Sequence, residues 1–199
     1  MSSSIDDIPG LIRIENTPQE QAIGLAASYT PGPSPFVTVE EYIDAPPQAV
    51  HAYLSDIRNL DEFTYSTRAF QPVEGKPGLY EGRDPLAHPD TKIFMRVTSD
   101  PAALTVDMHC AWDQGEELWM VYLHRIVDAQ TVLGRPGSVV LWTNSRHPYY
   151  DKNPFPELAP TPERPWVGDF WDIFAAAHAL ELQNLKKILE HRHGNGGAA

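Results

Sequence analysis

The chain has 199 residues, 42% of them hydrophobic and 10% aromatic, with a formal net charge of -12. This length suits one domain with an extension, and the apolar content suits a buried core rather than a disordered chain. The acidic balance argues against nucleic acid and anionic membranes as partners, since both attract basic surfaces. The sequence also lacks an apolar run of the roughly 18 residues that a membrane span needs.

Residues 1–35 are predicted to be an N-terminal extension. A short helix is expected over 19–28, and the proline-rich run 30–35 ends any regular structure. The first 14 residues lack the basic start and long apolar run of a signal peptide. Because Cys110 is the single cysteine, an intrachain disulfide is impossible, and we expect a cytoplasmic protein.

Residues 36–43 are rich in β-branched and aromatic side chains, which predicts a first strand. The Ala-Pro-Pro turn from Ala45 opens a helix, because proline is tolerated in a first helical turn. Apolar side chains continue at helical spacing to Leu54. A second short helix is expected around 57–63.

Short apolar runs separated by Gly, Pro and Asp then predict six further strands, near 65–73, 78–83, 92–98, 103–112, 117–127 and 138–146. Their short connections make consecutive strands antiparallel. A Pro-rich loop follows over 147–165, and it is either a pocket lid or a surface connection. The longest helical pattern runs from 166 to 191, so the predicted domain spans 36–193.

Alternation along the strands predicts which face of the sheet is inside, because neighbouring side chains point to opposite faces. The register of strand 117–127 rests on pairing Ala111 with Leu118 across the preceding turn. The predicted inner face comprises Ile93, Met95, Val97, Leu104, Val106, Met108, Cys110, Trp112, Trp119, Val121, Leu123, Arg125, Val140, Trp142, Asn144 and Arg146. The predicted outer face comprises Lys92, Arg96, Thr98, Thr105, Asp107, His109, Tyr122, His124, Thr143 and Ser145.

Three inner residues, Arg125, Asn144 and Arg146, are unusual for a core. A buried arginine needs a charged partner, water or a ligand. Either these residues sit at strand ends near solvent, or they line one end of a cavity and hold a polar group of a ligand.

The long helix carries a complementary apolar stripe. It comprises Trp171, Phe174, Ala175, His178, Leu182, Leu185 and Leu189. His178 lies in the middle of this stripe among alanines, which leave room for a ligand. It is either a hydrogen-bonded core histidine or a general acid or base in a pocket.

Residues 37–56 resemble the opening of the START/Bet v 1-like (SRPBCC) superfamily. In that family a strand runs into an Ala-Pro turn and then into a helix with the pattern Val-aromatic-x-x-Leu-x-Asp. Here His51 stands where an aromatic residue is usual, and Phe63 stands where Trp is common. The order of elements over 36–193 also matches. The resemblance implies an α+β helix-grip fold, in which a curved antiparallel sheet of about seven strands wraps around a long C-terminal helix, with two short helices after the first strand.

The resemblance also implies a cavity between the sheet and the last helix, and a small hydrophobic or aromatic molecule as its ligand. One hypothesis is a cofactor-independent enzyme similar to the polyketide aromatase/cyclases, a cyclase or lyase of secondary metabolism. In it His178 would be the acid or base, while Arg125 and Asn144 would orient substrate oxygens. The expected ligand-binding residues are Trp112, Trp119, Trp142, Arg146, Met108, Phe174 and Tyr149.

Two other hypotheses remain open. The same cavity would serve a non-catalytic carrier or sensor. Alternatively, the cavity is closed and the outer face binds a protein through Met120, Tyr122 and Leu141. A homodimer is compatible with each hypothesis.

Metal and nucleophile chemistry find little support in the sequence. The close pair His191 and His193 lies in the C-terminal tail, and the predicted outer positions of His109 and His124 favour a solvated polar face over a metal site. Cys110 lies in an apolar run and is expected to be a small core residue. We therefore expect no metal.

Overall fold

The structure is a computed structural model that describes residues 35–85, 90–113, 117–150 and 174–193, with the single positions 18, 21, 157 and 171. Apart from 18 and 21, these positions belong to the unit Pro35–Ala199. Most of the predicted helix 19–28 and of the loop 147–165 lies outside the described residues.

The described elements follow the predicted order closely. They are β1 (Phe36–Ile43), α2 (Pro47–Ser55), the 3-10 helix η2 (Ile57–Asn59), α3 (Leu60–Phe63), β2 (Arg68–Pro72), β3 (Tyr80–Arg83), β4 (Lys92–Asp100), β5 (Thr105–Trp112), β6 (Met120–Asp128), α4 (Ala129–Leu133), β7 (Ser138–Ser145), the 3-10 helix η3 (Pro148–Tyr150) and α5 (Phe174–His193).

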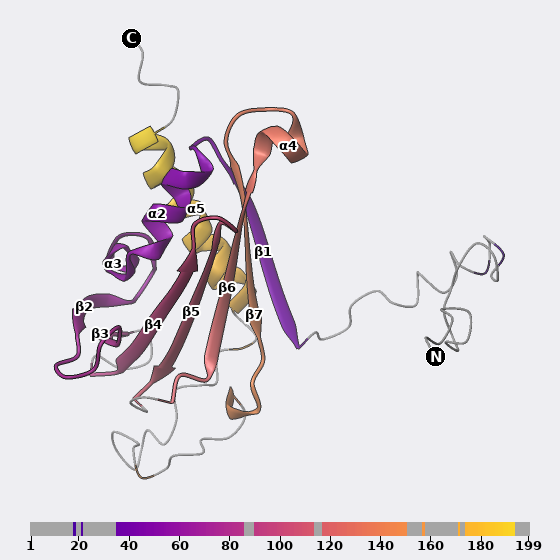
Figure 1. Ribbon diagram of the computed structural model, residues 1–199. Coiled ribbons are helices and arrows are strands. Elements are labelled where there is room, and N and C mark those ends of the chain that lie inside the picture. Colours follow the sequence, from indigo (N-terminus) through magenta and orange to yellow (C-terminus); the bar gives the residue numbers. More distant parts are fainter. Residues whose placement is uncertain are drawn as a thin grey trace, which may run out of the picture. The chain divides into compact units, whose positions relative to one another are not determined.

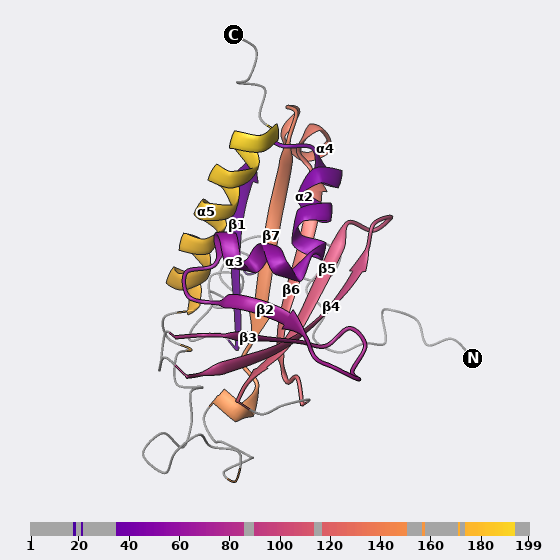
Figure 2. The ribbon, with the colours of Figure 1, turned by 90° about the vertical axis from the view of Figure 1, so that its left-hand side faces the viewer.

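The seven strands form one antiparallel sheet with the order β1-β7-β6-β5-β4-β3-β2. Helices α2, α3 and α5 lie on the same face of this sheet, and α5 runs alongside β1 (Figures 1 and 2). This arrangement is an α+β helix-grip fold, as predicted. No helix in the described part of the chain combines the length and apolar character needed to cross a membrane.

Helix α4 is an element that the sequence analysis missed. Asp128 caps it by accepting a hydrogen bond from the backbone N–H of Gln130, and Gly134 ends it with a left-handed φ of 67°. The short helix turns the chain from β6 into β7, as Figure 1 shows. It was missed because five residues between two strands carry too little helical periodicity to be noticed.

The predicted register of β6 is wrong by one residue. Cys110 pairs with Met120, whereas the predicted pairing of Ala111 with Leu118 would have placed Cys110 opposite Trp119. A slip of one residue turns every side chain of a strand to the other face of the sheet. The inward side chains of β6 are therefore Met120, Tyr122, His124 and Ile126.

Several predictions about the two faces fail for this reason. Leu123 is 45% exposed and Arg125 is also exposed, although both were predicted to lie inside. Met120, Tyr122 and His124 are buried, although they were predicted to lie on the outer face. The outer-face docking surface that included Met120 and Tyr122 therefore does not exist in the form predicted.

The alternation predicted for β4, β5 and β7 agrees with the structure. Their buried inward side chains are Ile93, Met95, Val106, Met108, Cys110, Trp112, Val140, Trp142 and Asn144. Arg146 is exposed just beyond the end of β7, contrary to prediction, and its backbone N–H donates to the carbonyl of Pro35 at 2.7 Å. On α5 the predicted stripe is buried except for Ala175, which is exposed because it points away from the sheet.

Candidate functional site

A cavity of about 70 Å³ lies between the sheet and the first turns of α5. Its lining comprises Leu60, Thr64, Ser66, Thr67, Asp84, Ile93, Met95, Met108, Trp112, Tyr122, Trp142, Phe174, Ala177, His178 and Glu181. A water molecule needs roughly 10–15 Å³ of such volume, so the cavity has room for about five waters. It is smaller than the roughly 300–1,000 Å³ of sites for drug-sized ligands. The volume suits a ligand of about one ring.

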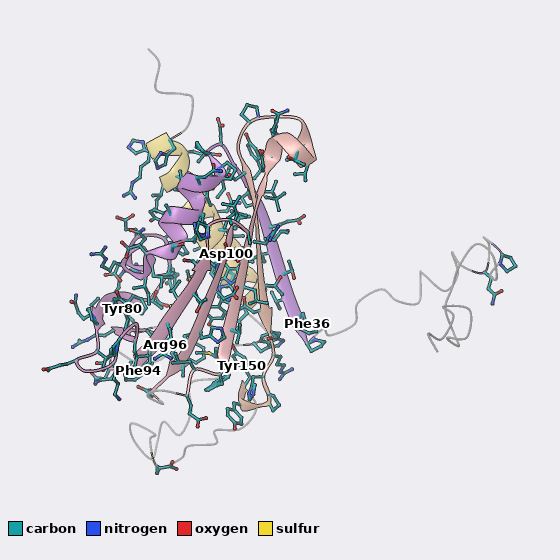
Figure 3. All side chains as sticks on the ribbon, in the orientation of Figure 1. Phe36, Tyr80, Phe94, Arg96, Asp100 and Tyr150 are labelled. Atoms are coloured by element: carbon teal, nitrogen blue, oxygen red, sulfur yellow. The ribbon has the colours of Figure 1, made fainter. Side chains whose placement is uncertain are left out.

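The cavity lies toward the end of the sheet where β7 finishes. Figure 3 labels Phe36 and Tyr150 at this end of the sheet and Asp100 toward the other. The ring of Tyr150 is buried, with its centroid 5.4 Å from that of the cavity residue Phe174. Thus η3 packs against the start of α5 and supports Phe174 without lining the cavity itself.

His178 is the centre of a buried chain of hydrogen bonds. The Asn144 amide Nδ2 lies 3.0 Å from His178 Nε2, and the Glu181 carboxyl oxygen Oε2 lies 3.0 Å from His178 Nδ1. Since an amide NH₂ can only donate, Nε2 accepts and Nδ1–H donates to Glu181. The other carboxyl oxygen of Glu181 accepts from the backbone N–H of Tyr65 at 2.9 Å. These bonds hold Glu181, and Glu181 fixes the orientation of the imidazole ring.

Three aromatic rings enclose the imidazole. The centroids of Trp142, Phe174 and Tyr122 lie 4.2, 5.2 and 5.4 Å from that of His178. Such contacts restrict the ring and exclude water from it, so the polar chain operates in surroundings of low dielectric constant.

Among the described residues, the buried Oδ1 atom of Asn144 and the buried indole N–H of Trp142 are polar groups near this chain without a hydrogen-bond partner. Turning the Asn144 amide over would offer Oδ1 to the ring in place of Nδ2. The neighbourhood of His178 therefore suits either protonation state of Nε2.

A second polar wall of the cavity is formed by Asp84. The indole N–H of Trp112 donates to Asp84 Oδ2 at 2.9 Å, and the backbone N–H of Asp84 donates to the carbonyl of Thr91. The hydroxyl side chains of Thr64, Ser66 and Thr67 line the cavity as well. Apart from these residues, His178 and Glu181, the described lining residues are aliphatic or aromatic.

Burial shifts the pKa of several groups around the site. Burial, with smaller contributions from neighbours that include Glu181, raises the pKa of Tyr122 well above its usual value. Burial also raises the pKa of the Cys110 thiol, as expected for a core residue. It lowers the pKa of His124 to about 4, against a weaker opposing effect of the bond between Nδ1 and the Val106 carbonyl. None of these three groups is charged near neutral pH.

The structure brings together some of the predicted site residues and separates others. Met108, Trp112, Trp142, Phe174 and His178 line the cavity, and Asn144 is bonded to His178. Arg125 points to the outer face because of the β6 register, and Arg146 lies past the end of its strand, so neither arginine borders the cavity.

Trp119 and Tyr149 form a separate aromatic cluster. The centroid of Trp119 lies 5.8 Å from Tyr149, 5.5 Å from His147 and 4.8 Å from Tyr150. This cluster packs the segment after β7 against the start of β6 and does not line the cavity.

Asp84, Tyr122 and Glu181 are among the cavity-lining residues that the sequence analysis missed. Glu181 had a usable signal, because it lies three residues after His178 and such residues meet on one face of a helix. Tyr122 was lost through the register error. Asp84 ends a short strand, and nothing in its sequence neighbourhood distinguishes it from a turn residue. Among the described residues, no three His, Cys, Asp or Glu side chains gather in a way that could hold a metal ion.

Comparison with solved structures finds the same fold in proteins of low sequence identity. The aromatase/cyclase Zhui from a Streptomyces species is 17% identical, with a TM-score of 0.53 over 82% of this chain and 98% of that one. The di-domain aromatase/cyclase BexL is 15% identical, with a TM-score of 0.53 over 78% of this chain and 46% of that one. The Aha1 dimer from Colwellia psychrerythraea is 16% identical, with a TM-score of 0.52 over 78% of this chain and 96% of that one.

At these identities the likeness shows a shared fold and no shared activity. No protein-family model matches the chain, and no curated protein sequence does. The function therefore has to be argued from the cavity.

Proposed function

We propose that the protein binds a small, largely apolar molecule in the cavity between the sheet and α5, and that His178 acts on it as a general acid or base. The observation that carries this proposal is the buried Asn144–His178–Glu181 chain at the wall of an otherwise mostly apolar cavity. Partners on both ring nitrogens satisfy the buried imidazole, and they also fix the tautomer and orientation that a general acid or base requires.

The chemistry follows from this arrangement. A proton taken up at Nε2 makes an imidazolium, which the Glu181 carboxylate next to Nδ1 stabilises. Asn144 can then present Oδ1, and the ring returns the proton to another atom of the bound molecule. Abstraction of a proton beside a carbonyl group, followed by its return or by loss of a hydroxyl group, needs little more than this. Such steps are in keeping with the fold neighbours Zhui and BexL, which are aromatase/cyclases by name.

The alternative is a non-catalytic carrier. It is favoured by the predominance of apolar side chains in the lining, among them Ile93, Met95, Met108 and Trp112. In that case the chain at His178 would only anchor a polar group of the ligand.

The test begins with native mass spectrometry of the purified protein, to identify a retained small molecule. Ala177→Phe fills the cavity and should abolish retention, whereas Ala176→Phe, one position along α5 on an exposed site, should not. Retention by both variants, or loss from both, would contradict binding in this cavity.

Catalysis is tested by incubating the extracted compound with fresh protein and following its conversion by mass spectrometry. We expect His178→Gln to retain the compound and to slow conversion by about a hundredfold. If the wild-type protein returns the compound unchanged, the carrier function holds. Conversion that survives His178→Gln would remove the histidine from the mechanism.

A further inference from the structure

The described walls of the cavity differ in how firmly they are built. The sheet forms one wall with side chains of β4, β5, β6 and β7, and backbone hydrogen bonds hold these strands in register. Helix α5 forms a second wall. The connection between α3 and β2 forms a third, to which its segment 64–67 contributes Thr64, Ser66 and Thr67. This segment belongs to no helix or strand, so it can move without disrupting one.

Segment 64–67 is joined to α5 by a hydrogen bond that continues the chain at His178. The backbone N–H of Tyr65 donates to Glu181 Oε1 at 2.9 Å, and Glu181 Oε2 lies 3.0 Å from His178 Nδ1. The connection from α3 to β2 passes beside α5 in Figure 2. The side chain of Tyr65 is 63% exposed, so this bond ties a surface segment to a buried carboxyl group. Movement of the segment away from α5 requires the loss of this bond.

The segment is held together by the side chain of Arg68. Its guanidinium group donates to the carbonyl oxygens of Thr64 and Thr67 at 2.9 and 2.6 Å, and to that of Tyr65 at 3.2 Å. A guanidinium group carries five N–H donors in a fixed planar arrangement, so it fixes these three carbonyl groups relative to one another. We therefore expect the segment to move as one unit.

The end of the segment toward β2 has the features of a hinge. Ala69 has a φ of 60°, in the left-handed region that is costly for a residue with a side chain. Its N–H donates to Asp61 Oδ2 in α3 at 2.9 Å, and the pairing of β2 with β3 shifts between Arg68 and Gln71. An irregularity of this kind interrupts the ladder between two strands. The backbone can thus change direction here at little cost to the sheet.

We propose that segment 64–67 is a lid over the cavity, which opens by losing the bond from Tyr65 to Glu181 and turning about Ala69. The inference rests on the proposed binding of a small molecule in this cavity and adds the wall through which the molecule enters. Since Glu181 also holds His178, closure of the lid and orientation of the imidazole depend on the same carboxyl group.

Thiol labelling measures the opening of the lid without a ligand. Met108 lines the cavity and is 1% exposed, whereas Cys110, two residues along β5, is fully buried and does not line it. Met108→Cys in a Cys110→Ala background therefore reports access to the cavity, and Cys110 of the unchanged chain reports access to the core. Methyl methanethiosulfonate is the probe, and intact mass gives its rate of addition. We expect the cavity thiol to react faster than Cys110.

Tyr65→Pro is the variant that removes the closing bond, because proline has no backbone N–H. Thr64 already has the extended backbone that a residue before proline requires, with φ -73° and ψ 152°. The variant should speed labelling of the cavity thiol about tenfold, as expected for the loss of one hydrogen bond to a carboxyl group, and leave Cys110 unchanged. Tyr65→Ala keeps the N–H and removes the exposed ring, so it is the matched control and should change neither rate.

Arg68→Met provides a second test, because it keeps the length of the side chain and removes the donors to the three carbonyl groups. It should speed labelling of the cavity thiol several-fold and leave Cys110 unchanged. This exposed position is suited to the test if Tyr65→Pro fails to fold.

Three results would overturn the lid. They are a cavity thiol that reacts no faster than Cys110 in the unchanged lid, equal rates for Tyr65→Pro and Tyr65→Ala, and acceleration of both thiols to the same extent by Tyr65→Pro or, if that variant does not fold, by Arg68→Met. The proposed function would survive each of them, since it depends on ligand retention and on its loss in Ala177→Phe.

Discussion

The two halves of α5 pack against different surroundings. The C-terminal half buries Leu185 and Leu189 in the hydrophobic core. Its polar side chains close the interface at the end of β1, where Glu190 accepts from the backbone N–H of Asp44 and Lys186 donates to the carbonyl of Tyr42.

The N-terminal half, in contrast, presents Phe174, Ala177, His178 and Glu181 to aromatic rings, buried polar groups and a cavity. Close packing of aliphatic side chains contributes stability, whereas buried polar groups beside empty space contribute little or cost some. The C-terminal half of α5 thus stabilises the fold, and the N-terminal half helps to form the site. Leu185→Ala tests this division, and two further substitutions test the neighbouring strand β6.

The largest effect on stability is expected in the C-terminal half of α5. Leu185 is fully buried, so Leu185→Ala should lower the free energy of unfolding by about 2–5 kcal/mol through lost burial and the cavity left behind. Urea unfolding measures the loss. The variant should still retain the ligand in native mass spectrometry, because Leu185 does not line the cavity. Leu180→Ala, at an exposed position on the same helix, is the control and should change stability little.

If Leu185→Ala destabilised the protein no more than Leu180→Ala, packing of the C-terminal half of α5 would not be what stabilises the helix on the sheet. Loss of the ligand at unchanged stability would show that the two halves are not separable.

The next effect concerns the strand beneath the site. The pKa of His124 is about 4, below the ordinary 6.5, because burial disfavours the charged ring. Between pH 6.5 and 4 the unfolded chain therefore binds a proton at His124 that the folded chain does not. Stability should fall as the pH falls through this window and level off below it, with a full effect of about 3 kcal/mol. The free energy of unfolding should be measured by urea titration at several pH values.

His124→Asn removes this titration and keeps an N–H for the carbonyl of Val106, so its acid response should be flatter than that of the wild type. His191→Asn, exposed near the end of α5, should behave like the wild type. A variant that loses stability with acid as steeply as the wild type would show that folding does not lower the pKa of His124.

The smallest effect is expected next to His124 on the same strand. Arg125 is exposed on the outer face, so Arg125→Ala should change the free energy of unfolding by no more than about 0.5 kcal/mol and leave ligand retention intact. The inward-facing neighbour Ile126 provides the contrast, since Ile126→Ala should cost about 2–5 kcal/mol. Similar costs for the two variants would contradict the register of β6.

The fold was predictable because it rests on local patterns. The alternation of Val106, Met108 and Cys110, and the spacing of Phe174, His178 and Leu182, each specify which face of an element is buried. The cavity wall formed by β5, β7 and α5 follows from these two periodicities. The order of elements, which matches a helix-grip fold, further predicted that this helix lies on the sheet.

The face of β6 could not be predicted in this way, because both of its faces carry apolar side chains. Either Tyr122 and Ile126 or Val121 and Leu123 would make a plausible inner set, and the connection from β5 chose between them by one residue. The predicted burial of Arg125 was a sign of the wrong register.

The sequence by itself thus determined the class of fold, the buried stripe of α5 and the position of His178 on it, since each depends on residues close together in the chain. Only the tertiary structure decided what His178 meets. Asn144 lies 34 residues away and reaches it through the pairing of strands, and Tyr65 fixes Glu181 from 116 residues away. Asp84 enters the cavity through the packing of β3 beside β4. Contacts between distant segments depend on register and on loop lengths, which local periodicity does not encode, and so the partners of His178 became visible only in three dimensions.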